Sequence, residues 1–255
     1  MSGMLRVVYV ANAGILFQYD GVTILIDGLY GDEPHAFSNP PVRTREKLMR
    51  GEPPLRGADF ILATHMHPDH ASAALIQKYL EKNAVRGLFL PKAVYYPERK
   101  LEQYIQEQKI PYFPLTSRNG KLTCRLTENI SVRIFPTLHS GREFRDVPHY
   151  CYILKFDDKE CLVTGDVDYT SETFGEYADH TFRCIFVNPL FLHAIHDPAH
   201  FHGHLRYEDL CVYHIPFQSD DRFGIRKMAE RDLRRWPEGE RVPVALKETL
   251  QVLVL

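Results

Sequence analysis

The segment Thr64–His70 holds three histidines and one aspartate within seven residues, directly after an apolar, strand-like run. Imidazole nitrogens and carboxylate oxygens are ligands that divalent cations such as zinc accept in proteins. Because successive side chains of an extended segment point to opposite sides, His65, His67 and Asp69 would face one way and His70 another. Four ligands placed like this serve two metal ions more easily than one.

Three more candidate ligands stand where later apolar runs end: His139, Asp166 and His214. A histidine or aspartate after a strand is often only a cap, a turn residue or a buried core residue, and these alternatives stay open for each position. Asp166 closes the run Leu-Val-Thr-Gly-Asp, and its carboxylate can bind two cations because both oxygens carry lone pairs.

In these residues the chain resembles the metallo-β-lactamase superfamily, whose signature His-x-His-x-Asp-His matches residues 65–70. The resemblance implies an α/β (α+β) fold, a four-layer αββα sandwich in which helices cover two packed sheets. It also implies two divalent metal ions, with zinc expected and manganese or iron as alternatives. The implied ligands are His65, His67 and His139 for the first ion, Asp69, His70 and His214 for the second, and Asp166 for both.

Asp27 closes the apolar run 22–26 and precedes Gly28. The resemblance places it beneath the metal cluster, where a carboxylate would accept a hydrogen bond from the second ring nitrogen of a metal-binding histidine. A turn-forming aspartate is the alternative explanation.

The resemblance further implies hydrolysis by a hydroxide shared between the two cations, because a metal pair lowers the pKa of water towards about 7. Asp69 would also orient this hydroxide. His204 lies in a Gly-His-Leu element that resembles the phosphodiesterase and tRNA-processing branch, which is related to lactonases, and it would protonate the leaving oxygen. Another histidine of residues 193–204 could take this role, or the loop could have no catalytic duty.

We expect the substrate to be a small anionic ester: a phosphodiester, a cyclic phosphate or a phosphorylated lactone. Arg142, Arg145 and Arg222 could hold its phosphate or carboxylate, and His193 is a further candidate for substrate binding. A thioesterase or lactonase of the same fold and a non-catalytic metal-binding sensor are the alternatives, because fold and metal do not fix the substrate. A diiron redox protein would usually carry glutamate in place of the second histidine, so His67 argues against it.

The chain has 255 residues, of which 44% are hydrophobic and 25% charged, and we expect one domain over 1–255. A loop insertion is expected near 28–57 and a His-rich loop near 191–205. The net charge of −2 favours no polyanion, and acidic residues interrupt the basic stretch 222–235. We therefore expect no nucleic-acid partner, and the sequence leaves the oligomeric state open.

The five cysteines are scattered without a Cys-x-x-Cys pair, which predicts buried free thiols in a reducing compartment. The first residues lack a signal-peptide pattern, and no apolar run reaches the length of a membrane span. We therefore expect a soluble, cytoplasmic protein without a membrane partner.

Hydrophobic periodicity and turn residues predict the elements that position these side chains. The predicted strands are 6–10, 14–19, 22–27, 60–63, 87–90, 121–126, 130–135, 150–156 and 160–164, and the predicted helices are 44–49, 71–83 and 97–108.

Overall fold

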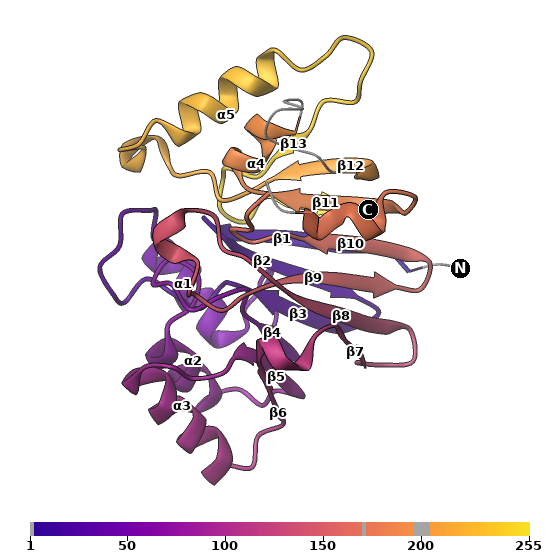
Figure 1. Cartoon of the computed structure of the whole chain (residues 1–255). Coiled ribbons are helices and arrows are strands. Elements are labelled where there is room, and N and C mark those ends of the chain that lie inside the picture. The colour runs from indigo at the N-terminus through magenta and orange to yellow at the C-terminus, as the bar shows by residue number, and fades with distance from the viewer. Residues whose placement is uncertain (1–2, 170–171, 196–204) are drawn as a thin grey trace. The chain divides into compact units, whose positions relative to one another are not determined.

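The structure is a computed structural model that describes residues 3–169, 172–195 and 205–255 (Figure 1). The chain divides into two compact units, which are described separately below. Unit 1 comprises Met1–Asn119 and Glu248–Leu255, and unit 2 comprises Gly120–Lys247. Each unit is built on one seven-stranded mixed sheet. The single domain over 1–255 stays a prediction.

The sheet of unit 1 has the strand order β14-β1-β2-β3-β4-β5-β6, with antiparallel pairs from β14 to β3 and parallel pairs from β3 to β6. Its strands are β1 (Arg6–Ala11), β2 (Gly14–Tyr19), β3 (Val22–Ile26), β4 (Phe60–Leu62), β5 (Gly87–Pro91), β6 (Tyr112–Leu115) and β14 (Val252–Val254). Because β3 and β4 are parallel and Ile26 is in register with Leu62, the residues that follow these two strands lie at the same edge of the sheet.

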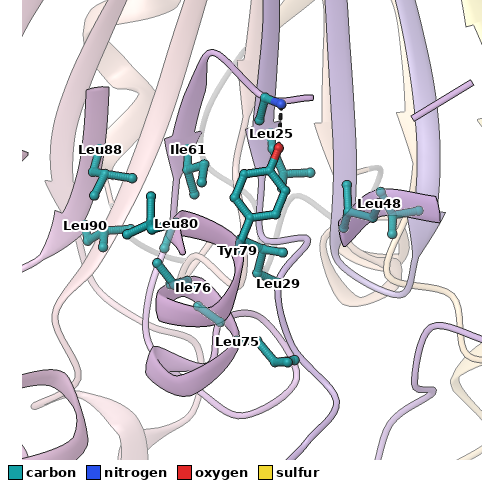
Figure 2. Packing of buried hydrophobic residues seen from close by; sticks show 14 of the residues in the cluster. Leu25, Leu29, Leu48, Ile61, Leu75, Ile76, Tyr79, Leu80, Leu88 and Leu90 are labelled. Atoms are coloured by element: carbon teal, nitrogen blue, oxygen red, sulfur yellow. Dashed lines mark hydrogen bonds between the residues drawn. The ribbon is translucent and has the colours of Figure 1, made fainter. Parts of the chain in front are cut away.

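The helices of unit 1 are α1 (Val42–Arg50), α2 (Ala73–Leu80) and α3 (Tyr96–Glu107), and a short 3₁₀ turn, η1, spans Ser117–Asn119. Their apolar side chains pack against alternating residues of the strands and form one buried core (Figure 2). Tyr79 of α2 is fully buried, and its hydroxyl accepts a hydrogen bond of 2.7 Å from the backbone N–H of Ala58. This bond ties α2 to the segment that leads into β4.

The sheet of unit 2 has the order β13-β12-β11-β10-β9-β8-β7, antiparallel from β7 to β10 and parallel from β10 to β13. Its strands are β7 (Leu122–Arg125), β8 (Ile130–Thr137), β9 (His149–Phe156), β10 (Lys159–Val163), β11 (Thr181–Val187), β12 (Arg206–Val212) and β13 (Val244–Ala245). Strands β8, β10 and β12 therefore run in the same direction, so their carboxyl ends meet at one edge of the sheet.

The helices of unit 2 are α4 (Pro189–Ala194) and α5 (Ile225–Arg234), with 3₁₀ turns η2 (Arg142–Phe144), η3 (Glu172–Tyr177) and η4 (Gln218–Asp220). Helices α4 and α5 pack against each other, and their apolar residues form a second core with one face of the sheet (Figure 1).

The elements predicted from the sequence are present in the structure, with ends that differ by a few residues. The predicted helix 71–83 is shorter at both ends: it begins at Ala73, because Ser72 caps α2 by accepting a hydrogen bond of 3.3 Å from the N–H of Leu75, and it ends at Leu80. The cysteines are free, as predicted; four are buried and Cys124 is half-buried. Within the described ranges, no helix combines the length and the apolar character needed to cross a bilayer.

Candidate metal centre

Four candidate ligands lie in the turn that follows β4, and we call them the β4 cluster: His65, His67, Asp69 and His70. A ligand atom of His65 lies within 4.8 Å of one on His67, and the same limit holds for His65 with His70. Asp69 Oδ2 lies 3.6 Å from His70 Nε2. His65, Asp69 and His70 are buried and His67 is half-buried. The turn thus brings the candidate ligand atoms of these four side chains close to one another.

Asp27, the first residue after β3, anchors this turn through three hydrogen bonds. Its Oδ1 accepts from the N–H of Thr64 at 2.8 Å, and its Oδ2 accepts from the Thr64 hydroxyl at 2.6 Å. Oδ2 also lies 3.0 Å from His70 Nδ1. A carboxylate can only accept, so Nδ1 carries the proton and the lone pair of the His70 ring lies on Nε2, on the side of Asp69 Oδ2. This geometry suits the role predicted for Asp27, which stays a prediction.

Asn12 is a buried residue beside the β4 cluster that the sequence analysis did not single out. It lies in the turn between β1 and β2 with a positive φ of 42°, a conformation that asparagine tolerates better than most residues. Its Nδ2 donates to the backbone oxygen of Asp69 at 3.2 Å and lies 3.4 Å from Asp69 Oδ2. Asn12 therefore orients both the backbone and the carboxylate of Asp69.

Tyr30 is a second buried neighbour of these carboxylates. Burial, followed by the nearby charges of Tyr9, Asp69 and Asp27, raises the pKa of the Tyr30 phenol well above its ordinary value. Its hydroxyl lies 3.3 Å from the backbone oxygen of Ser38, to which it donates. Tyr30 therefore stays neutral and adds no negative charge to the β4 cluster.

Unit 2 gathers its three candidate ligands at the edge where β8, β10 and β12 end, and we call them the Asp166 cluster: His139, Asp166 and His214. Asp166 Oδ2 lies 4.0 Å from His139 Nε2 and 3.6 Å from His214 Nε2. Both histidines are buried, and the side chain of Asp166 is 19% exposed. A single carboxylate oxygen therefore faces both imidazoles.

The turn that carries Asp166 is held from three sides. The N–H of Gly165, which has a φ of 57°, donates to the Tyr213 hydroxyl at 3.0 Å, and the N–H of Asp166 donates to His149 Nε2 at 3.0 Å. Asn188 Nδ2 donates to Asp166 Oδ1 at 3.2 Å. Because Oδ1 is engaged, Oδ2 is the oxygen left facing the histidines. The sequence analysis identified none of the three supporting side chains.

His139 and His214 are fixed in different ways. His139 Nδ1 lies 2.6 Å from the backbone oxygen of Ser140, so Nδ1 donates and the lone pair of the ring lies on Nε2. The ring of Phe144 meets the His139 ring edge-on, with 5.1 Å between centroids. His214 has a φ of 59°, a left-handed conformation that is uncommon for histidine and often marks a functional position.

The remaining site candidates lie in different surroundings. Arg142 belongs to η2 and Arg145 follows it, so both flank Phe144, which contacts His139; the Arg145 guanidinium pairs with Asp168 at 3.6 Å. Arg222 lies in the turn between η4 and α5. His193 Nδ1 on α4 lies 2.8 Å from Asp232 Oδ2 on α5. His204 lies outside the described residues, as do most residues of the predicted loop 191–205.

Cys151 is fully buried, and its thiol contacts the backbone oxygen of Thr164, two residues before Asp166. Burial raises the pKa of its thiol to about 12, so it stays protonated at neutral pH. The available donors are therefore imidazole nitrogens and carboxylate oxygens, several of them already oriented by a second hydrogen bond. This donor set fits borderline divalent cations such as zinc, manganese and iron.

The sequence profile described as "Beta-lactamase superfamily domain" matches residues 23–212, and the chain belongs to this family. Two mixed sheets with flanking helices agree with this assignment, and the predicted fold class, the metallo-β-lactamase fold, is confirmed. The matched range includes every candidate ligand except His214, which follows two residues later. Membership of the phosphodiesterase and lactonase branch stays a prediction, and no curated protein matches the sequence.

Several solved structures share the fold at low sequence identity. A metallo hydrolase from the archaeon Ignicoccus hospitalis is 14% identical, covers 99% of this chain and 98% of its own, and has a TM-score of 0.59. An isothiocyanate hydrolase from Delia radicum gut bacteria is 13% identical, with coverage of 97% and 98% and a TM-score of 0.60. The diiron β-hydroxylase CmlA from Streptomyces venezuelae is 12% identical, with coverage of 100% and 54% and a TM-score of 0.60.

Proposed function

We propose that this chain is a metal-dependent hydrolase whose β4 cluster and Asp166 cluster contribute ligands to one centre with two divalent cations. The observation that carries the proposal is that hydrogen bonds within each unit orient the candidate ligand atoms of its own cluster. His70 and His139 each carry the ring proton on Nδ1, so that the lone pair lies on Nε2, and Asp166 presents Oδ2 to two histidines. Ligands oriented in this way are typical of metal sites rather than of turns that merely cap a strand.

The proposed ligands follow the family resemblance residue by residue. They are His65, His67 and His139 for one cation, Asp69, His70 and His214 for the other, and Asp166 for both. Zinc is the proposed metal. Iron is the principal alternative, because CmlA, a diiron enzyme, shares the fold.

Bound divalent cations lower the pKa of water and polarise an oxygen of the substrate. The protein's own residues would orient the reactants. The Asp69 carboxylate, held by Asn12, would accept a hydrogen bond from the attacking water, and Asp27 would keep the His70 ring in its required tautomer. His204 is the proposed donor of a proton to the leaving oxygen.

The proposed substrate is a small anionic ester, such as a phosphodiester, a cyclic phosphate or a phosphorylated lactone. The argument rests on Arg142 and Arg145, which flank Phe144 next to His139 and can bind a phosphate or carboxylate. The salt bridge from Arg145 to Asp168 leaves Arg142 as the more available of the two. The alternative substrate is an uncharged lactone, thioester or isothiocyanate. The alternative function is that of a metal-binding sensor without turnover.

The test measures metal content and hydrolysis on the same preparations. Protein reconstituted with zinc, manganese or iron is assayed on a chromogenic phosphodiester, a lactone, a thioester and an aryl isothiocyanate. His67→Ala is the site variant. His180→Ala is the matched control, because His180 pairs with Glu160 at 2.9 Å and belongs to neither cluster.

We expect two metal ions per chain and phosphodiester turnover that falls by at least about 100-fold in His67→Ala but not in the control. Turnover confined to an uncharged ester would overturn the anionic substrate and leave the hydrolase in place. Two bound ions without any turnover would favour the sensor. A chain that binds no divalent cation would refute the proposal.

A further inference from the structure

His149 connects the two turns of unit 2 that carry candidate ligands. It is the first residue of β9, and its register partner across the strand pair is Thr137, the last residue of β8, two positions before His139. On its other side its ring reaches the N–H of Asp166. The side chain is 1% exposed, so these contacts are shielded from water.

The direction of the hydrogen bonds around His149 follows from the chemistry of the donors. A backbone N–H can only donate, so the 3.0 Å contact from Asp166 N requires a lone pair on His149 Nε2. In a neutral imidazole the proton then resides on Nδ1, which lies 2.6 Å from Thr137 Oγ1 and donates to it. The structure therefore fixes one tautomer of His149.

The chain of hydrogen bonds continues beyond Thr137 and returns to the same turn. Thr137 Oγ1 lies 3.7 Å from Cys151 Sγ. Because Oγ1 accepts a hydrogen bond from His149, the hydroxyl hydrogen of Thr137 can point towards the sulfur. Cys151 Sγ donates to the backbone oxygen of Thr164 at 3.3 Å. The path thus starts at Asp166 and ends at Thr164, the residues on either side of Gly165, and every donor points in the same direction.

Two backbone hydrogen bonds close the same region. Ser140 N–H donates to the backbone oxygen of Asp166 at 2.8 Å, and Asp168 N–H donates to that of Leu138 at 2.7 Å. They pair the segment that carries His139 with the segment that carries Asp166. His149 adds a side-chain link between Thr137 and Asp166.

We propose that His149 is a positioning residue that holds Asp166 Oδ2 at the distance from His139 Nε2 required for both to bind one cation. The inference rests on the proposed function, since it concerns the same metal centre. His149 itself binds no metal, because both of its nitrogens are engaged by protein groups. It acts through the backbone of Asp166, and it lies outside the residues on which the family resemblance rests.

The test compares three variants with the metal alone as probe. His149→Phe keeps the ring volume and removes the acceptor, His149→Gln restores an acceptor for the N–H of Asp166, and His180→Phe controls for the loss of a histidine elsewhere in unit 2. Zinc dissociation constants are measured by competition with a chromogenic chelator, and urea unfolding of the metal-free proteins measures stability. Nitrogen-15 NMR of the wild type reports which ring nitrogen of His149 carries the proton.

We expect His149→Phe to weaken zinc binding by about 10- to 100-fold and His149→Gln to recover most of the loss, with the control unchanged. The nitrogen-15 spectrum of the wild type should show a protonated Nδ1 and an unprotonated Nε2 for His149. If His149→Phe does not fold, Thr137→Val gives the second measurement, with weaker zinc binding and a loss of that signature.

Three outcomes would overturn the inference. A protonated Nε2 in the wild type contradicts the hydrogen-bond directions. Equal zinc affinities for wild type and His149→Phe, with or without a change in unfolding, mean that the role is structural only, and the proposed function then stands. A wild type that binds no zinc, manganese or iron refutes the proposed function together with the inference.

Discussion

Replacing Asp27 by asparagine separates metal binding from stability in unit 1. The native carboxylate accepts from the Thr64 N–H, the Thr64 hydroxyl and His70 Nδ1, and the backbone there has a φ of 51°. Asparagine tolerates this φ and keeps one oxygen for the Thr64 N–H. Its amide nitrogen, however, would face His70 as a donor. His70 Nδ1 must then accept, which moves the ring proton to Nε2, the atom needed for a cation.

The magnitudes distinguish Asp27→Asn from Asp27→Ala. Asparagine replaces hydrogen bonds to a charged group by weaker ones, at a cost of about 2 kcal/mol of unfolding free energy. Alanine leaves two buried donors of Thr64 unsatisfied, at about 1–3 kcal/mol each. It also places an ordinary residue in the left-handed region, which adds about 1 kcal/mol. The expected loss of about 3–7 kcal/mol is comparable to the total stability of many domains, which begins at about 5 kcal/mol.

The assay combines urea unfolding of the metal-free protein with zinc competition. Asp27→Asn should remain folded and bind zinc about 10- to 100-fold more weakly than the wild type. Asp59→Asn is the matched control: its carboxylate accepts from the N–H of Thr23 at 2.9 Å, away from any candidate ligand, so it should lose some stability and no zinc affinity. Undiminished zinc affinity in Asp27→Asn would refute the assignment of the His70 tautomer and the supporting role of Asp27.

Three further predictions concern stability. Asn188→Ala removes the side chain that caps α4, so urea unfolding should show a loss of about 1 kcal/mol, and zinc competition should show weaker binding; an unchanged zinc affinity would contradict its support of the metal centre. Tyr79→Phe leaves the buried N–H of Ala58 without its acceptor (Figure 2). The same urea assay should show a loss of about 1–3 kcal/mol in unfolding free energy, and an unchanged value would mean that water replaces the hydroxyl. Burial raises the pKa values of Cys151 and Cys161 from 9.0 to about 12, so above pH 9 these thiols ionise in the unfolded chain only. Stability should therefore fall with rising pH, by about 3 kcal/mol between pH 8 and pH 10 from the two thiols together, and a double Cys→Ala variant that shows the same fall would contradict this origin.

Local patterns explain why most elements could be predicted from the sequence. Strands such as β2 and β3 are runs of mainly apolar residues between turn residues, and α3 carries apolar residues at helical spacing. Each of these elements can therefore be recognised from a short stretch of sequence. The short strands β13 and β14 have no such local pattern. β14 pairs with β1, from the opposite end of the chain, and this pairing depends on the complete sheet rather than on three residues. β6 includes Pro114, which disfavours a strand assignment, although the edge of a sheet tolerates it.

The same contrast holds for the candidate site. The proposed ligands could be identified because each follows a strand and several belong to a recognisable motif. The residues that support the proposed ligands belong to no recognisable sequence motif. His149 reaches Asp166 only through the pairing of β8, β9 and β10, and Asn12 reaches Asp69 across 57 positions. Their roles arise from strand register, which a local pattern cannot specify.

The backbone conformation at three of these positions indicates that the protein itself orients the proposed ligand atoms. Asn12, Asp27 and His214 are non-glycine residues with positive φ, a conformation that asparagine and aspartate tolerate best and that costs an ordinary residue such as histidine about 1 kcal/mol. Hydrogen bonds within unit 1 hold the first two, and these bonds are the ones that orient Asp69 and His70. The chain therefore accepts local strain where it fixes ligand atoms, as expected of a functional site. It follows that the metal affinity lost in variants such as Asp27→Asn and His149→Phe measures this orientation, because the ligands themselves remain unchanged.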